Sequence, residues 1–256
     1  MNISFYTAAV GAQQQQTRLN VHANNIANVN TYGFRAKKPS FSALMTGPIT
    51  GINEDLPRGV GSRLIGADTD FSQFSLLETD RHLDYAIEGK GFFGLLDPVT
   101  GEYSYTRDGS FIKSEFKVMV EPEPEETEGD TPPEALEPVE ETRWYLCDGL
   151  RRFVLGADGE PIEVLDEVEM QPIGIFDFIN YNGIQSMGDN RFIPVEKNGE
   201  VGLGSGKLVQ GFLELSNADL ANEMTRVIES QRSFQYMLRM VTTSEEIEST
   251  VNNLRS

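Results

Sequence analysis

The sequence of 256 residues predicts an α+β fold, in which N- and C-terminal helices pair as a coiled coil and an antiparallel β domain lies between them. Apolar residues recur at heptad spacing near both ends of the chain. Between the ends, short apolar runs alternate with Asp-Gly and Asn-Gly dipeptides, which favour tight hairpin turns. These two patterns, each confined to its own part of the chain, determine the fold class.

The first segment, about residues 3–28, has the pattern of a helix that contains no proline. Its apolar positions follow a 4-3 spacing, which is typical of a heptad stripe in a coiled coil. An amphipathic helix that packs on its own domain would account for the pattern equally well. His22 lies off the stripe, on a polar face, where we expect a surface or interhelix contact. The stripe consists of Phe5, Ala9, Ala12, Leu19, Ala23 and Ile26, with Gln16 as its polar member.

The last segment, about residues 216–254, predicts a second and longer helix. It contains neither proline nor glycine and would extend about 58 Å at 1.5 Å per residue. Ser216 and Asp219 resemble a capping box at its start. Because so long a helix needs a partner, we expect it to pair with the first. Its stripe consists of Leu220, Met224, Val227, Gln231, Phe234, Leu238 and Val241, and continues with a change of phase through Ile247, Val251 and Leu254.

These patterns divide the chain into three regions. Residues 1–36 and 207–256 form the predicted helical domain, residues 37–80 an extended connector rich in Gly, Ser and Pro, and residues 81–206 the β domain. An acidic, proline-rich insertion interrupts the β domain at about residues 115–142. We expect a solvated loop there, because the insertion has too few apolar residues to offset the entropy of ordering.

The charge of the chain excludes one class of partner. The sequence has 40 acidic and 21 basic residues, a formal charge of −19, and without the ten carboxylates between Glu121 and Glu141 this charge would be −9. Nucleic acid repels such a chain unless a basic patch intervenes, and the densest basic clusters are only pairs. No apolar run is long enough for a transmembrane helix, so we expect no direct membrane insertion.

Signals for catalysis or metal binding are weak, and we expect no catalytic residues, no metal site and no cofactor. Cys147 is the single cysteine, and His22 and His82 stand far apart without a metal-binding motif. Gly204-Ser205-Gly206-Lys207 resembles part of a phosphate-binding loop. The full motif would require glycine at Val201 and serine or threonine at Leu208, so the resemblance does not indicate a nucleotide site.

An asparagine-rich motif follows the first helix. Taken alone it would indicate a helix stop, since Asn and Gly33 tolerate left-handed backbone conformations. In this order, however, the motif resembles that of the flagellar axial proteins, the rod and hook family of the bacterial basal body. Segments 82–93, 105–111, 209–217 and 223–234 resemble further motifs of that family. The motif residues are Asn24, Asn25, Ala27, Asn28, Asn30, Thr31, Gly33 and Phe34.

Within the family, residues 56–63 are similar to those of distal rod members, whereas residues 235–237 differ from their commoner ending. A proximal rod or hook-type paralogue is therefore an alternative. The resemblance implies a structural subunit that assembles helically with its own copies and with other rod and hook proteins. It also implies export by the flagellar type III apparatus without cleavage of a signal peptide, a location in the basal body outside the cytoplasm, and contact with outer ring or bushing proteins.

Two alternatives come from other classes of protein. A peptidoglycan-acting enzyme would carry convergent catalytic residues in a cleft. A free coiled-coil adaptor would form a discrete complex with a partner instead of filaments. The candidate assembly interface consists of thirteen residues of the two stripes, from Phe5 to Ile26 without Gln16 and from Leu220 to Val241, because helices with exposed stripes need partner helices.

Overall fold

The computed structural model describes residues 3–44, 47–49, 53–58, 61–120 and 139–255. The chain divides into two compact units. Met1–Phe74 and Ser216–Ser256, from both ends of the sequence, form the unit that we call the helical unit, and Ser75–Leu215 form the β unit. Helices at the two ends thus flank an antiparallel β region, which confirms the expected α+β class.

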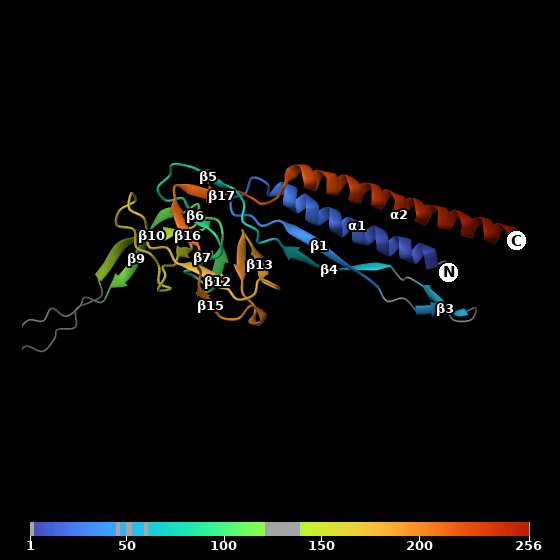
Figure 1. Cartoon of the computed structure of the whole chain (residues 1–256), viewed down its shortest axis with the longest axis horizontal. Helices are drawn as coiled ribbons and strands as arrows, with labels where there is room; N and C mark the ends of the chain where they lie inside the picture. The colour runs from blue at the N-terminus through green and yellow to red at the C-terminus, as the bar shows by residue number, and fades with distance from the viewer. Residues whose placement is uncertain (1–2, 45–46, 50–52, 59–60, 121–138, 256) are drawn as a thin grey trace, which may run out of the picture. The chain divides into compact units, whose positions relative to one another are not determined.

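The helical unit contains two helices, α1 (Ile3–Ala27) and α2 (Leu220–Arg255), which lie side by side (Figure 1). They run in opposite directions, because His22 near the end of α1 contacts Glu223 at the start of α2. Neither of the two described helices is long and apolar enough to span a membrane.

The start of α2 differs from the predicted capping box. Asp219 rather than Ser216 caps the helix, since its Oδ1 accepts the N–H groups of Ala221 at 2.9 Å and Asn222 at 3.3 Å. The Ser216 hydroxyl accepts the N–H of Ala218 at 3.2 Å, one turn ahead of the helix. The sequence indicates both Ser216 and Asp219 as possible capping residues. Because the chain turns at Ser216, the helix begins only at Leu220, directly after Asp219.

A β hairpin completes the helical unit. Strands β1 (Lys37–Ala43) and β4 (Ser62–Thr69) pair antiparallel, with a bulge between Ser40 and Phe41. Short strands β2 (Gly47–Ile49) and β3 (Asn53–Arg58) pair beyond them. Most of the expected connector is therefore a hydrogen-bonded ribbon. Its prolines fit there, because a two-stranded ribbon has only edge strands.

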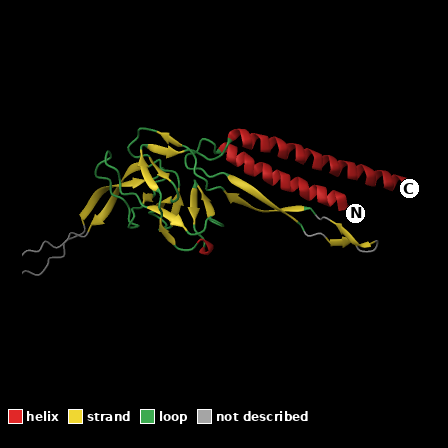
Figure 2. Ribbon diagram, in the orientation of Figure 1, coloured by secondary structure: helices red, strands yellow, loops and turns green. Residues whose placement is uncertain are grey.

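The β unit is built around a nine-stranded sheet, counted over the described residues (Figure 2). Its strand order is β13-β14-β8-β7-β11-β10-β9, and β12 pairs with both β7 and β15. Two further antiparallel pairs, β16-β6 and β17-β5, join the two ends of the unit's sequence. The strands are β5 (Leu76–Glu78), β6 (Tyr85–Glu88), β7 (Phe92–Leu96), β8 (Tyr103–Thr106), β9 (Ile112–Val120), β10 (Val139–Cys147), β11 (Phe153–Val154), β12 (Ile175–Phe178), β13 (Gln185–Gly188), β14 (Arg191–Ile193), β15 (Val201–Leu203), β16 (Lys207–Gln210) and β17 (Phe212–Glu214).

The apolar runs of the sequence supply the core of this unit. Strands β7, β8, β10, β11 and β12 each overlap one of the short apolar runs of the sequence, at residues 92–96, 103–105, 144–146, 153–155 and 173–176. The acidic insertion lies mostly outside the described residues, and its ends form β9 and β10, which pair along their whole length. The core side chains, all buried, are Leu83, Tyr85, Ile87, Phe93, Leu95, Phe111, Leu146, Val154, Ile162, Val164 and Ile173.

A buried arginine ties the end of the β unit to its interior. Arg107 Nη1 lies 3.1 Å from Glu214 Oε2, and both side chains are almost fully buried. The same guanidinium donates to the carbonyl of Ile87 at 3.2 Å and to that of Gly89 at 2.6 Å. Because a buried carboxylate requires a partner, this pair fixes β17 against β6 and the turn after β8.

Candidate functional site

The contact between α1 and α2 is made of small and polar side chains. Ala8, Ala12 and His22 are buried on α1, and Glu223, Ser230 and Ser244 are buried on α2. On α2 these positions are separated by multiples of seven residues, so they lie on one stripe of the helix. The half-buried side chains that fill the intervening 4-3 positions are Val227, Phe234, Met237 and Val241.

Gly11 allows α1 to approach α2 closely. A Cβ atom at this position would lie 3.1 Å from Met237 Sδ, closer than an ordinary contact. Small residues at a helix contact bring the backbones together and leave little space for long side chains. The contact stripe is therefore narrow, with methionine filling the space over glycine.

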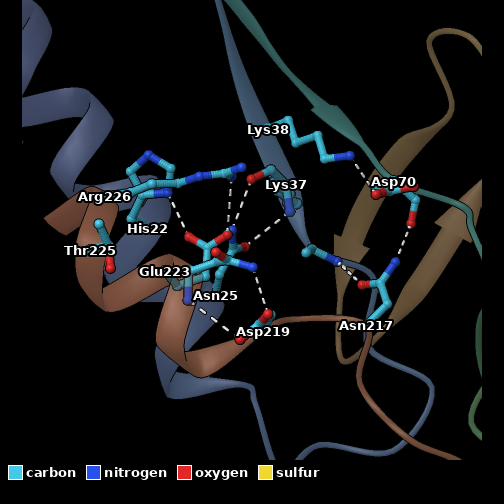
Figure 3. A network of polar contacts seen from close by, with 12 residues as sticks. His22, Asn25, Lys37, Lys38, Asp70, Asn217, Asp219, Glu223, Thr225 and Arg226 are labelled. Carbon is cyan, nitrogen blue, oxygen red and sulfur yellow. Dashed lines mark hydrogen bonds and ion pairs between the residues drawn. The ribbon is translucent and has the colours of Figure 1, made fainter. Parts of the chain in front are cut away.

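A hydrogen-bonded histidine–glutamate pair is buried at the end of the contact stripe where α1 finishes (Figure 3). His22 Nδ1 lies 2.6 Å from Glu223 Oε2, and the two side chains are 3% and 7% exposed. Arg226, one turn further along α2, approaches the other carboxylate oxygen of Glu223 at 3.4 Å. Breaking a buried pair of this kind leaves an uncompensated polar group, so the pair favours one alignment of the two helices.

Two asparagines connect the helices to the hairpin through backbone groups (Figure 3). Asn25 accepts the N–H of Lys37 and donates to its carbonyl, each at 2.9 Å. Asn217, just before α2, accepts the N–H of Ala36 at 2.6 Å and donates to the carbonyl of Asp70 at 2.7 Å. Both side-chain amides thus supply the hydrogen bonds that a neighbouring strand would otherwise make to the backbone at the root of the hairpin, where β1 begins and β4 ends.

Asp70 links the two strands at the same end of the hairpin. Its Oδ2 accepts from Lys38 Nζ at 2.6 Å, and its Oδ1 accepts the N–H of Ser72 at 3.1 Å. Partial burial alone would raise the pKa of this carboxyl, but the hydrogen bonds from Lys38 and Ser72 outweigh it and hold the pKa of Asp70 below its usual value. The carboxylate is therefore ionised at neutral pH.

The asparagine-rich motif forms the end of α1 and the turn after it. Asn28 Nδ2 donates to the carbonyl of Asn24 at 2.9 Å, and the Thr31 hydroxyl donates to Asn28 Oδ1 at 3.3 Å. Gly33 has a φ of 66°, the left-handed conformation expected for it, and Phe34 is buried. Asn24, Ala27 and Asn30 are at the surface. The motif therefore acts locally, by ending α1 and directing the chain into β1.

The structure distributes the thirteen predicted interface residues over three environments. Ala12 is buried in the contact with α2. The stripe of α2 that contacts α1 shares Val227, Phe234 and Val241 with the predicted stripe but is rotated toward Glu223, Ser230 and Ser244. An apolar pattern could not reveal those three positions, because their side chains are polar. Half-buried residues are Phe5, Ala9, Leu19, Ile26, Val227, Phe234 and Val241, and exposed ones are Ala23, Leu220, Met224, Gln231 and Leu238.

The rotation leaves many large apolar side chains of α2 in solvent, each between 41% and 82% exposed. At about 100° per residue, they fall on both sides of the contact stripe. We call the set on one side of the stripe the first patch and the set on its other side the second patch. The first patch consists of Leu220, Met224, Ile228 and Leu238, and the second of Tyr236, Met240, Ile247, Val251 and Leu254.

Helix α1 is covered more completely than α2, because it also contacts the hairpin. Gln14 Oε1 accepts the N–H of Leu64 in β4 at 2.8 Å. The Arg18 guanidinium lies 5.0 Å from the centre of the Phe41 ring in β1. Surface available for further contacts is therefore concentrated on α2.

The β unit has a surface hollow of about 640 Å³, where catalytic groups of an enzyme could gather. Asp97 and Glu115 lie on its wall. Hydrogen bonds from the N–H groups of Val99 and Thr100 hold the pKa of Asp97 below its usual value, so this carboxyl is a poor proton donor. Among the described residues, no three His, Cys, Asp or Glu side chains gather as a metal site.

Comparison with known proteins places the sequence in one group along nearly its whole length. Residues 5–35 match the flagella basal body rod protein family, and residues 86–134 match the D1 domain of the flagellar hook protein FlgE/F/G. Residues 209–254 match the C-terminal family of the flagellar basal body rod FlgEFG proteins.

Individual relatives agree with these matches. The flagellar basal-body rod protein FlgG of Bacillus subtilis is 33% identical, and that of Borreliella burgdorferi 32%, each over 98% of both chains. FlgG of Buchnera aphidicola from Schizaphis graminum is 30% identical over 95% of this chain and 96% of its own. The flagellar hook protein FlgE of Helicobacter mustelae is 37% identical, but over only 43% of this chain.

Proposed function

The chain belongs to the FlgG family of flagellar basal-body rod proteins and is a structural subunit of the rod, and from this premise we propose that its copies assemble helically into a shaft that transmits torque to the hook. The family is structural and not enzymatic. The exposed apolar surface of α2 is the observation that supports the helical assembly.

The two patches on α2 account for the geometry of such an assembly. A monomeric soluble protein rarely exposes this much apolar side chain along one helix. The patches differ in composition and lie on different sides of the helix, so the first patch of one copy can contact the second patch of the next. A contact between unlike surfaces, repeated by a rotation that does not close a ring, produces an open helical filament.

We propose that the α1–α2 pairs of neighbouring copies pack as a coiled coil that forms the inner tube of the rod. The thirteen residues of the predicted interface serve this assembly in two ways. Half-buried residues such as Val227 and Phe234 join α1 to α2 within a copy, and exposed ones such as Leu220, Met224 and Leu238 join α2 to the next copy. The β1–β4 hairpin, which contacts α1 through Leu64 and Phe41, stiffens this layer of helices.

Family membership also supports the remaining proposals on location and partners. The subunit is exported by the flagellar type III apparatus without cleavage of a signal peptide, and it functions outside the cytoplasm, in the periplasm or cell wall region. Its axial neighbours are other rod and hook proteins, and outer ring or bushing proteins surround it.

One substitution in each patch tests the assembly. Leu238→Glu and Met240→Glu alter side chains that are 44% and 55% exposed, so the subunit should fold. In cells that lack the native gene, we expect neither variant to form rods in electron micrographs of basal bodies or to restore motility. Leu150→Glu makes the same change at a residue of the β unit that is 61% exposed and should restore both.

Mixed expression separates a filament from a discrete complex. A variant with one intact patch should add to a growing rod and then block the next addition, so it should shorten rods when expressed with the wild-type chain. Normal motility with both patch variants would contradict the proposal. A stoichiometric complex that stays the same size at all concentrations would favour the adaptor alternative.

A further inference from the structure

The β unit contains two Asn-Gly dipeptides, Asn182-Gly183 and Asn198-Gly199, and the structure treats them differently. In such a dipeptide the backbone nitrogen of glycine can attack the side-chain amide of asparagine, since glycine has no side chain to hinder the approach. The reaction requires that both atoms be free to move into contact. Because the two dipeptides are chemically identical, any difference in their reaction rates reflects their different surroundings in the folded protein.

At Asn198, both atoms of the side-chain amide and the backbone nitrogen of the following glycine form hydrogen bonds. Its side chain is completely buried. Its Oδ1 accepts the N–H of Val195 at 2.6 Å, and its Nδ2 donates to the carbonyls of Asn180 at 2.8 Å and Asn182 at 3.2 Å. The nitrogen of Gly199 donates to the carbonyl of Glu196 at 3.5 Å. Attack at Asn198 would require all these bonds to open.

Asn182 lies in an exposed turn between β12 and β13. Its backbone N–H donates to Asn180 Oδ1 at 3.0 Å, but within the described residues no hydrogen bond engages its side-chain amide or the nitrogen of Gly183. Gly183 has a φ of 87° and open space where a Cβ would be. The reactive atoms are thus solvated and unhindered.

We infer that Asn182 is a site of spontaneous deamidation, a modification that is independent of the proposed assembly. The nitrogen of Gly183 loses its proton to solvent and forms a bond to Cγ of Asn182, and the side-chain nitrogen takes a proton from solvent and leaves as ammonia. The resulting succinimide is then hydrolysed by water, which opens either of its two carbonyls to give aspartate or isoaspartate. No oxidant, reductant or enzyme takes part.

The products change the turn in two ways. Each adds one negative charge at the surface. In isoaspartate the main chain runs through Cβ and Cγ and is one methylene longer, and the carbonyl of Asn182 that accepts the bond from Asn198 becomes part of a free α-carboxylate. An aged subunit would thus carry more charge and a looser link between this turn and Asn198.

Peptide mapping of the full chain tests the inference. The purified protein is incubated in mildly alkaline buffer, digested with trypsin and analysed by mass spectrometry at successive times. Cleavage at Arg152, Arg191, Lys197 and Lys207 places the two asparagines on different peptides. We expect conversion at Asn182 to be at least about tenfold faster than at Asn198, which must wait for local opening. Labelling by an isoaspartyl methyltransferase identifies the isoaspartate product.

Two controls make the result specific. In denaturant the two rates should become similar, because the dipeptides are the same. Asn182→Gln should remove the product from that peptide and leave Asn198 unchanged. Equal rates in the folded protein would overturn the inference, as would conversion of both sites in denaturant with none at Asn182 in the native chain.

Discussion

His22 Nδ1 lies 2.6 Å from Glu223 Oε2, across 201 positions of the sequence, and the other buried side chains of the two helices near this contact are mostly alanines and serines. A polar pair in such a contact specifies how two helices align, since every other alignment leaves its members without partners. The Arg226 guanidinium approaches the other oxygen of the same carboxylate at 3.4 Å. The pair therefore fixes the register of α1 on α2 at the end of the contact where α1 finishes and α2 begins.

Replacing Glu223 should reveal what this pair contributes. Glu223→Ala leaves His22 buried without its partner, and we expect the free energy of unfolding to fall by about 3 kcal/mol. Urea denaturation followed by circular dichroism measures the change. Glu229→Ala, an exposed position on the same helix, should alter stability by less than about 0.5 kcal/mol. Equal losses in the two variants would show that the pair has no special role.

Acid should remove the contribution of Asp70. Its pKa is lowered in the folded state, so its ionised form stabilises the fold above the pKa of the unfolded chain, and that stabilisation is lost as the pH falls through the folded value. We expect Asp70→Asn to be less stable than wild type at neutral pH and equally stable in strong acid. Urea denaturation across this pH range gives the difference, with the exposed Asp68→Asn as control. A difference that persists unchanged in acid would contradict the assignment.

Two Asp-Gly turns offer a test of close packing in the β unit. A Cβ at Gly109 would lie 1.7 Å from the carbonyl oxygen of Tyr85, whereas one at Gly149 would meet nothing within 4 Å. Gly109→Ala must displace backbone, so we expect it to cost about 3 kcal/mol. Gly149→Ala should change stability by less than about 0.5 kcal/mol. Thermal unfolding of both variants checks this, and similar melting temperatures would refute the predicted contact.

Cys147 should be inert in the folded protein. It is fully buried, and burial raises the pKa of its thiol to about 12. Because the thiolate is the reactive form, alkylation by iodoacetamide at mildly alkaline pH should be about a thousandfold slower than in urea. Ser42→Cys supplies an exposed thiol for comparison. Native reactivity of Cys147 equal to that of the added cysteine would contradict this prediction.

Sequence patterns recovered those parts of the fold that depend on local periodicity. The apolar runs at Phe92–Leu96 and Phe153–Val154 are strands, and the heptad regions are α1 and α2. The periodicity of the sequence did not indicate the hairpin, because its strands contain Gly, Ser and Pro and its paired residues lie far apart in the sequence, from Ala43 with Ser62 to Lys37 with Thr69. Its partners at the root, Asn25 and Asn217, come from opposite ends of the sequence.

The sequence by itself determined the family, the two terminal helices and the antiparallel character of the middle, because these depend on neighbouring residues and their spacing. Only the tertiary structure decided which side of α2 is buried. Glu223, Ser230 and Ser244 are polar, so an apolar stripe could not include them, yet α1 offers His22 and small side chains opposite them. Burial of these residues depends on partners some two hundred positions away. The same choice leaves Leu220, Met224 and Leu238 in solvent, as the proposed assembly requires.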